Sequence, residues 1–234
     1  MNKEIHTADL GRIDYQEAWD YQEKLLQENV RIKLARGKGT GEEDTTNYLL
    51  FCEHPPVYTL GKSGHIENLL ISEQQMQEQG IHFFPTNRGG DITYHGPGQV
   101  VAYPILDLEN FFTDIGKYLR FLEDVVIRTL AEYGITGSRS PGETGVWLDP
   151  EDKTRARKIC AMGVRCSRWV TMHGLALNVN TDLRYFNNII PCGITDKKVA
   201  SLNEELGREI PVAEVKAKMQ QHFADVFGGT IIVK

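Results

Sequence analysis

The chain has 234 residues, of which 41% are hydrophobic and 25% charged, close to the globular average, which argues against disorder. Its 26 Lys and Arg and 32 Asp and Glu give a formal net charge of −6, which disfavours nucleic-acid binding because that normally needs a basic face. No run approaches the roughly eighteen apolar residues of a membrane helix, and the first residues lack the apolar segment of a secretory signal. We therefore expect a cytoplasmic protein that does not enter membranes.

An amphipathic helix is predicted near the start of the chain, and short strands follow it. Asp14 and Glu17 form a capping-box pattern ahead of Ala18, Leu25 and Leu26, and the helix should end before residues 37–41. Apolar stretches bounded by Pro and Gly then predict strands at 48–52 and 57–60, a brief helix at 72–79, and a strand at 81–84.

The second half of the chain contains the clearest helix pattern. Apolar residues fall on one stripe at 3.6-residue spacing from about Thr113 to Tyr133, and a final helix runs from Pro211 to Val226. Strand-like segments occur at 99–106, 146–148, 158–165, 175–179 and 230–233. Because several strands follow one another without a helix between them, we predict an α/β protein of the α+β type. Its sheet should be mixed, largely antiparallel and flanked by helices. No linker or repeat divides the chain, so we predict one domain over residues 1–234.

The glycine-rich segment, residues 87–99, is the densest candidate for a functional site. Four glycines and a proline surround Arg88, Tyr94 and His95 in the sequence Asn-Arg-Gly-Gly-Asp-Ile-Thr-Tyr-His-Gly-Pro-Gly-Gln. The spacing fits neither a P-loop nor a dinucleotide-binding fingerprint. Two tight turns would also explain the glycines, but turns rarely need interleaved Arg, Tyr and His.

Four cysteines, Cys52, Cys160, Cys166 and Cys192, contain no C-x-x-C pair and are too sparse for a disulfide scaffold, so we expect free thiols. Cys52 and Cys160 lie in apolar strands and fit the buried residue that a free cysteine usually is. Cationic neighbours such as Arg165 favour a Cys166 thiolate, although a solvated turn explains that position equally well. No partners at ligand spacing indicate a metal site.

Cys192 is the best candidate nucleophile, because Pro191 and Gly193 can present it on a stiff turn. Burial as a small apolar residue is the alternative. A nucleophilic thiol needs a nearby cation or base, and the candidates are Lys158, His173 and His95. Lys158 precedes an apolar run and can point inward or lie at a solvated strand end; His173 can equally be a hydrogen-bonded turn residue.

A basic cluster within an otherwise acidic chain would attract an acidic partner, or it would form a solvated face. Its members are Lys153, Arg155, Arg157, Lys158, Arg165 and Arg168.

Together these motifs resemble the octanoyltransferases of lipoate biosynthesis, also called lipoate-protein ligase B. The likeness rests on residues 88–99, on Arg157-Lys158-Ile159, on residues 173–178 (His-Gly-Leu-Ala-Leu-Asn) and on Pro191-Cys192-Gly193, and it extends from about Asp9 to Ser201. It implies a fold similar to the catalytic domains of lipoate and biotin protein ligases. It also implies an enzyme that moves an octanoyl group from acyl carrier protein to a lysine of lipoyl domains, such as those of 2-oxoacid dehydrogenases or the glycine cleavage H protein, without a cofactor.

The resemblance also implies roles for individual residues. Cys192 corresponds to the acyl-thioester nucleophile and Lys158 to the lysine that lowers its pKa, and His173 is a possible supporting residue. The three walls of the acyl pocket correspond to Arg88, Gly89, Gly90, Asp91, Ile92, Thr93, Tyr94 and His95, then Ala161, Met162 and Gly163, then Gly174, Leu175 and Ala176. Cys160 and Asp91 depart from the family pattern without touching the Cys–Lys pair.

Two other functions fit the sequence less well. An ATP-dependent lipoate ligase would carry a serine and a glycine triplet where this chain has residues 88–91, and would lack the Gly-Pro-Gly after His95. A non-catalytic module that binds acyl carrier protein would use only the basic cluster and would never become acylated. Whether Lys158 or His173 deprotonates the acceptor amine stays open at this stage.

Overall fold

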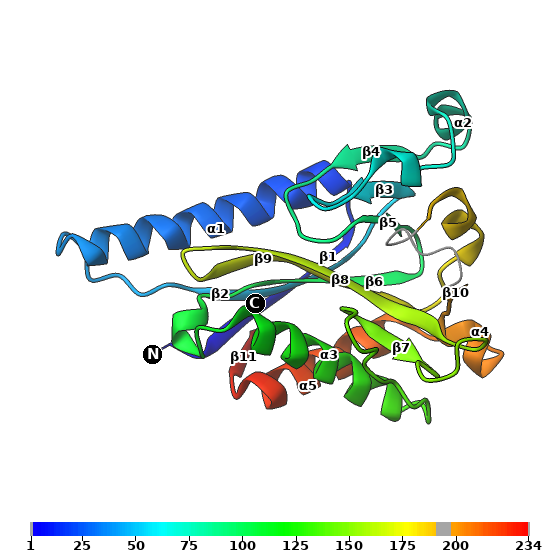
Figure 1. Cartoon of the computed structure of the whole chain (residues 1–234). Helices are drawn as coiled ribbons and strands as arrows, with labels where there is room; N and C mark the ends of the chain where they lie inside the picture. The colour runs from blue at the N-terminus through cyan, green and yellow to red at the C-terminus, as the bar shows by residue number, and fades with distance from the viewer. Residues whose placement is uncertain (1, 191–197, 234) are drawn as a thin grey trace.

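The strands form two sheets, shown in the computed structural model of Figure 1, which describes residues 2–190 and 198–233. Cys192, with its neighbours Pro191 and Gly193, lies outside the described residues. The main sheet has the order β10-β8-β9-β6-β2-β1-β11, and β7 pairs with β8 beside this path. Its strands are β1 (Glu4–Arg12), β2 (Asn47–Glu53), β6 (Gln99–Ile105), β7 (Val146–Leu148), β8 (Arg157–Ser167), β9 (Val170–Asn178), β10 (Lys198–Val199) and β11 (Thr230–Val233).

The small sheet has the order β4-β3-β5. Its strands are β3 (Val57–Leu60), β4 (His82–Pro85) and β5 (Ile92–His95). In the main sheet the central pairs β2–β6, β6–β9 and β8–β9 are antiparallel, whereas β1 pairs in parallel with both β2 and β11. The predicted mixed, largely antiparallel sheet is therefore confirmed.

Helices cover both faces of the main sheet (Figure 1). Helices α3 (Ile115–Ala131) and α5 (Val212–Phe227) lie side by side on one face, and α1 (Tyr15–Gly37) packs against β6 and β9 on the other. Two short helices, α2 (Glu73–Glu78) and α4 (Leu202–Leu206), lie outside this arrangement. Within the described part of the chain, no helix is long and apolar enough to cross a membrane.

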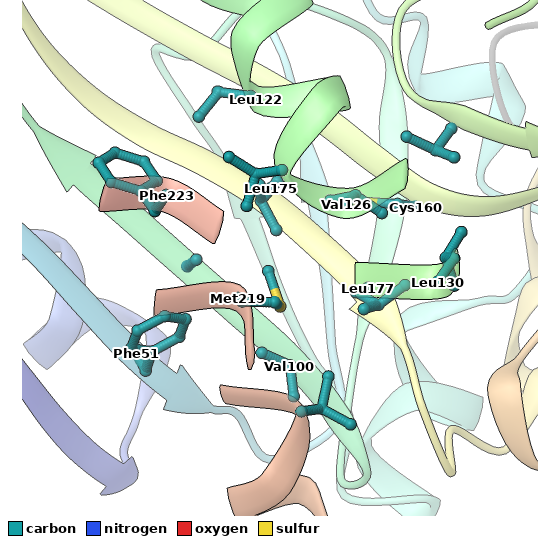
Figure 2. Packing of buried hydrophobic residues seen from close by; sticks show 14 of the residues in the cluster. Phe51, Val100, Leu122, Val126, Leu130, Cys160, Leu175, Leu177, Met219 and Phe223 are labelled. Carbon is teal, nitrogen blue, oxygen red and sulfur yellow. The ribbon is translucent and has the colours of Figure 1, made fainter. Parts of the chain in front are cut away.

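The larger core lies between the main sheet and helices α3 and α5 (Figure 2). Leu122, Val126 and Leu130 form the buried stripe of α3 that its 3.6-residue spacing predicted. They pack with Met219 and Phe223 of α5 and with side chains of β6, β8 and β9. The apolar faces of α3 and α5 thus pack on one face of the sheet. Because side chains alternate along a strand, the remaining residues of β8 and β9 point to the opposite face, away from these helices.

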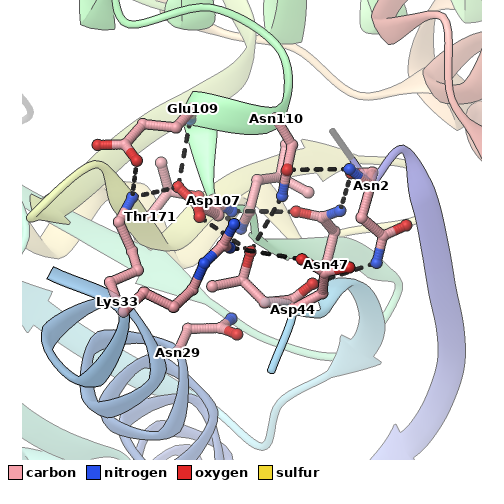
Figure 3. Close-up of polar contacts among 12 residues, drawn as sticks. Asn2, Asn29, Lys33, Asp44, Asn47, Asp107, Glu109, Asn110 and Thr171 are labelled. Atoms are coloured by element: carbon pink, nitrogen blue, oxygen red, sulfur yellow. Dashed lines mark hydrogen bonds and ion pairs between the residues drawn. The ribbon is translucent and has the colours of Figure 1, made fainter. Parts of the chain in front are cut away.

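Side-chain caps begin helices α1 and α3, and of the two only the Asp14 cap was predicted. Asp14 accepts a hydrogen bond from the Gln16 backbone N–H at the start of α1, and Asp114 does the same for Lys117 at the start of α3. Near the other end of α1, a buried polar cluster ties the helix to the sheet (Figure 3). There Lys33 pairs with Asp107, which also accepts a hydrogen bond from Thr45 Oγ1 (2.9 Å).

Some elements were not predicted. Strand β1 has polar residues at most positions, and β5 lies inside the glycine-rich segment. Strands β8 and β9 are longer than predicted and meet in a tight hairpin, with Arg168 (φ 50°) and Trp169 (φ 66°) in the turn. Cys166 and His173 therefore lie within strands, whereas both fall outside the predicted strands and a turn was considered for each.

Candidate active site

A cavity of about 230 Å³ lies where the small sheet meets β6, β8 and β9 of the main sheet. Segments far apart in the sequence line it, and most of the predicted site residues are among them: Arg88, Gly90, Asp91, Ile92, Thr93, His95, Lys158, Ala161, Met162, Gly163, His173, Gly174, Leu175 and Ala176. This volume is below the roughly 300–1,000 Å³ of clefts for drug-sized ligands, so the space suits a small ligand or part of a larger one.

Two predicted pocket residues do not line this cavity. Gly89 lies against β8, where its N–H donates to the Val164 carbonyl (2.9 Å). Tyr94 is buried in a separate apolar cluster, where its ring stacks on Tyr185 at 4.8 Å. Both residues therefore lie outside the lining and pack against the elements that form it.

The glycine-rich segment comes close enough to β8 to leave no room for a side chain. A Cβ on Gly163 would lie 2.7 Å from the Gly89 carbonyl oxygen and 3.1 Å from Arg88 Cδ. The buried Arg88 guanidinium donates to the Thr59 carbonyl (2.7 Å), to Thr59 Oγ1 (2.8 Å) and to the Gly89 carbonyl (3.0 Å). Arg88 thus ties the segment to β3. The segment contains strand β5, with a close backbone approach before it and one turn, at residues 97–98, after it.

His95 belongs to a chain of buried polar side chains that line the cavity. Its Nδ1 lies 2.8 Å from Gln99 Oε1, so that nitrogen carries the proton, and Gln99 Nε2 donates to Asn178 Oδ1 (2.9 Å). Asn178 Nδ2 in turn donates to the Ala200 carbonyl (3.0 Å). Burial lowers the pKa of His95 to about 3, with the neighbouring His54 adding to the effect. His95 is therefore neutral at physiological pH.

His173 is also a neutral imidazole. Its Nε2–H donates to Asn87 Oδ1 (2.7 Å), and its ring is 1% exposed. Burial first, and then the positive charge of Arg88, lowers its pKa to about 3. Such a group is a weak proton acceptor at neutral pH.

Lys158 lies at the start of β8, partly buried at the edge of the cavity. Its Nζ is 4.7 Å from the centre of the Trp147 ring on the adjacent strand β7, which is a cation–π distance. The Lys158 carbonyl accepts a hydrogen bond from the Ala200 N–H (2.9 Å), which ties β8 to the end of β10. Of the two positions considered for Lys158, inward or solvated, the structure gives the inward one.

The three described cysteines are not activated thiols. Cys52 and Cys160 are fully buried, as expected for inert residues, and burial raises the pKa of both. Burial also raises the pKa of Cys166, more than nearby Lys33 lowers it, so the suggestion that cationic neighbours favour its thiolate was wrong.

Carboxylates neutralise much of the basic cluster. Arg155 and Arg157 both pair with Asp149, and Arg157 pairs also with Glu205. Arg165 pairs with Glu23 on α1. Intramolecular ion pairs therefore occupy a large part of the charge that the sequence suggested for an acidic partner.

Several residues that line the cavity were not predicted. Tyr15 comes from the first turn of α1, Val101 and Tyr103 from β6, Trp147 from β7, and Phe186 from the 3₁₀ helix η3 (Leu183–Asn188). In the sequence they are ordinary apolar and aromatic positions of buried elements. Only the alternation along β6, which turns Gln99, Val101 and Tyr103 to the same face, could have suggested them.

The sequence is similar to a known protein family and to named members of it. Residues 14–224 match the family model described as the lipoyl protein ligase A/B catalytic domain. An octanoyltransferase of Christiangramia forsetii is 62% identical over 97% of both chains, and one of Flavobacterium psychrophilum is 61% identical over 99% of this chain and 100% of the relative. These relatives do not favour the ATP-dependent alternative.

Solved structures show the same fold. The bipartite lipoate protein ligase of Thermoplasma acidophilum superimposes with a TM-score of 0.69 at 15% identity, covering 100% of this chain and 86% of the other. Lipoate-protein ligase A bound with ATP gives 0.70 at 15% identity, covering 100% and 89%, and the biotin protein ligase of Aquifex aeolicus gives 0.54 at 15% identity, covering 95% and 70%. The predicted ligase-like fold is confirmed. The chain belongs to the lipoyl protein ligase A/B catalytic domain family. Because it is 61–62% identical to octanoyltransferases over nearly its whole length, it is an acyltransferase of that family.

Proposed function

We propose that the protein transfers an octanoyl group from octanoyl-acyl carrier protein to the lysine of a lipoyl domain, through a thioester on Cys192. The observation that carries the proposal is the small, largely apolar cavity with Lys158 at its edge, in a chain 62% identical to an octanoyltransferase. The sequence motifs around Arg88, Lys158 and His173 all contribute to its lining.

The proposed reaction does not require ATP to proceed. The donor is a thioester, and attack by the Cys192 thiolate breaks the carrier thioester while it forms a new one, releasing the carrier thiol. The acceptor lysine amine then attacks the acyl-enzyme, forms an amide and releases Cys192. Because an amide is more stable than a thioester, the second step makes the transfer run downhill.

Lys158 would serve both half-reactions. As an ammonium it would stabilise the Cys192 thiolate before the first attack. When the carrier sulfur leaves, Lys158 would donate its proton to it, so that the carrier departs as a thiol and Lys158 becomes a neutral amine. That neutral amine can then accept the proton of the attacking acceptor amine, which restores the ammonium beside the released Cys192 thiolate. The depressed pKa of His173, about 3, supports this division of roles because a neutral His173 is too weak a base to compete.

The cavity would bind the acyl chain. Its lining combines apolar side chains such as Val101 and Leu175 with Gly163 and Gly174, whose missing side chains let neighbouring backbone pack closely behind the wall. Each CH₂ group buried there contributes about 0.8 kcal/mol to binding. Backbone N–H groups near Gly163 or Gly174 would stabilise the oxyanion of the tetrahedral intermediate.

The proposal also specifies partners and location. Acyl carrier protein is the donor, and the acceptors are lipoyl domains of 2-oxoacid dehydrogenases and of the glycine cleavage H protein. We propose that residues 1–234 act as one catalytic domain, and that the enzyme works in the cytoplasm, where thiols stay reduced.

A transfer assay tests the proposal. Purified lipoyl domain is incubated with octanoyl-acyl carrier protein and enzyme in the absence of ATP, and its mass is measured. We expect octanoylation by the wild type, and its loss in Cys192→Ala and in Lys158→Ala. Modification that requires ATP and free octanoate, or that persists in Cys192→Ala, would contradict the proposal.

A further inference from the structure

A buried carboxylate on α3, Glu123, has no part in the proposed chemistry, yet it lies directly behind the wall of the cavity. Its side chain is 0% exposed in the middle of a helix in which Glu123 is the one charged residue among the buried positions. A buried carboxylate is costly unless it is paired, so its partners indicate what it does.

Glu123 contacts residues 138–147, called the 138–147 loop here, which end in the first two residues of β7. Its Oε1 accepts a hydrogen bond from the Gly145 N–H (3.1 Å), and its Oε2 pairs with Arg139 Nε (2.8 Å). Arg139 is fixed further by its bond to the Arg120 carbonyl (2.9 Å) and by its pairing with Asp124. One carboxylate of α3 thus binds both the beginning and the end of this loop.

The loop forms the side of the cavity next to Lys158. Gly142, Glu143 and Thr144 line the cavity, and so does Trp147, whose ring faces Lys158 Nζ. Gly145 sits tightly against β8: its φ is 117°, and a Cβ there would be 2.5 Å from the Cys160 carbonyl oxygen and 3.7 Å from Lys158 Cδ. A shift of the Gly145 backbone would therefore displace Trp147 and the stem of Lys158 together.

Helix α3 provides a rigid base for this arrangement. It contacts both β7 and β8 and lies beneath them in Figure 1, and Leu122 and Val126, on either side of Glu123, are buried in the core. We infer that Glu123 is a positioning residue, which fixes the 138–147 loop so that Trp147 and Lys158 keep their geometry at the cavity. This inference rests on the proposed role of Lys158.

The negative charge of Glu123 and its positioning role would shift the pH midpoint of Cys192 alkylation in opposite directions. A measurement of this midpoint can therefore distinguish the two. If Glu123 acted only as a nearby negative charge, its removal would favour the thiolate and lower the pH midpoint of alkylation. If it positions Lys158, its removal weakens the ammonium–thiolate interaction and raises that midpoint. The sign of the shift therefore decides between the two.

The main variant is Glu123→Gln, which keeps an oxygen for the Gly145 N–H but presents an N–H group to Arg139. We expect the alkylation midpoint of Cys192 to rise by about half a pH unit or more. We expect kcat to fall about 10- to 100-fold with a smaller change in KM, as is typical of a misplaced catalytic group. Hydrogen exchange at the Gly145 amide should become faster.

Two arginines provide a matched pair of controls. Arg120 and Arg139 each bond Glu123 Oε2 at 2.8 Å, but only Arg139 belongs to the loop. Arg139→Ala should change the midpoint and the Gly145 exchange in the same direction as Glu123→Gln, whereas Arg120→Ala should change neither. Asp107→Asn, which disrupts the buried Lys33 pair at the far end of α1, controls for general destabilisation.

The outcomes distinguish this inference from the proposed function. A raised midpoint in Lys158→Ala together with an unchanged or lowered midpoint in Glu123→Gln would overturn the role of Glu123 alone. Equal effects of Arg120→Ala and Arg139→Ala, or an equal effect of Asp107→Asn, would also overturn it. An unchanged midpoint in Lys158→Ala would contradict the proposed function itself.

Discussion

A single methyl group tests whether the glycine-rich segment and β8 form one wall of the cavity. In Gly163→Ala the new Cβ would lie 2.7 Å from the Gly89 carbonyl oxygen and 3.1 Å from Arg88 Cδ, so the backbone of one strand must move. In Gly89→Ala, on the opposite side of the same contact, the new Cβ would meet only the Val164 carbonyl oxygen, at an ordinary 3.5 Å. The two variants add the same atom to the same interface.

The expected energies differ in sign. A Gly→Ala change without strain stabilises by about 0.4–1 kcal/mol, because the unfolded chain loses freedom. Overpacking in a close contact costs about 1–3 kcal/mol. Because both variants share the gain from the unfolded chain, Gly163→Ala should be less stable than Gly89→Ala by the overpacking cost alone, about 1–3 kcal/mol, or roughly 2–12 °C in Tm for a domain of this size.

Urea unfolding of both variants measures this difference, and the KM for octanoyl-acyl carrier protein measures its consequence. Gly163→Ala should raise KM because the displaced Arg88 segment lines the cavity, whereas Gly89→Ala should leave KM near the wild-type value. Equal stabilities and equal KM values in the two variants would refute the close packing of this wall.

Three further predictions follow from the site. Because the pKa of His95 falls to about 3 in the folded protein, against about 6.5 unfolded, stability should decrease as pH drops from about 6.5 towards 3, by up to roughly 1.4 kcal/mol per pH unit. His95→Gln should flatten that slope in urea unfolding, and a superimposable acid limb would contradict the burial of a neutral imidazole. Hexanoyl-acyl carrier protein should have a kcat/KM about 15-fold below that of the octanoyl donor, from two CH₂ groups at about 0.8 kcal/mol each; equal values would exclude a chain-binding cavity. Because burial raises the pKa of Cys166, iodoacetamide at neutral pH should react rapidly with wild type and Cys166→Ala but not with Cys192→Ala; retained rapid labelling in Cys192→Ala would place the reactive thiol elsewhere.

The helical part of the fold was predictable from local signals. Helix α3 carries an apolar stripe at 3.6-residue spacing and an Asp cap, and both act over a few residues. Strand β1 lacks such a signal because parallel pairing with β2 and β11, rather than an apolar alternation, determines its place. The hairpin turn at Arg168 and Trp169 was missed because neither residue is a usual one at positive φ.

The chemistry-bearing residues of the site were easier to find than its walls. Arg88 and Lys158 stood out because charged residues among glycines or ahead of an apolar run are unusual. Tyr103 and Trp147 were invisible because an aromatic residue in a strand usually belongs to the core, and only the packing of two sheets turns them towards the cavity. Glu123 was missed because a lone Glu in an amphipathic helix normally faces water.

The acyl-enzyme itself is the most direct test of the proposed reaction. The enzyme is mixed with octanoyl-acyl carrier protein without an acceptor, and its intact mass and peptide map are recorded before and after hydroxylamine. We predict one octanoyl group on Cys192 that hydroxylamine removes and that Cys192→Ala never acquires. Absence of the adduct, or an adduct that survives in Cys192→Ala, would contradict transfer through this thiol.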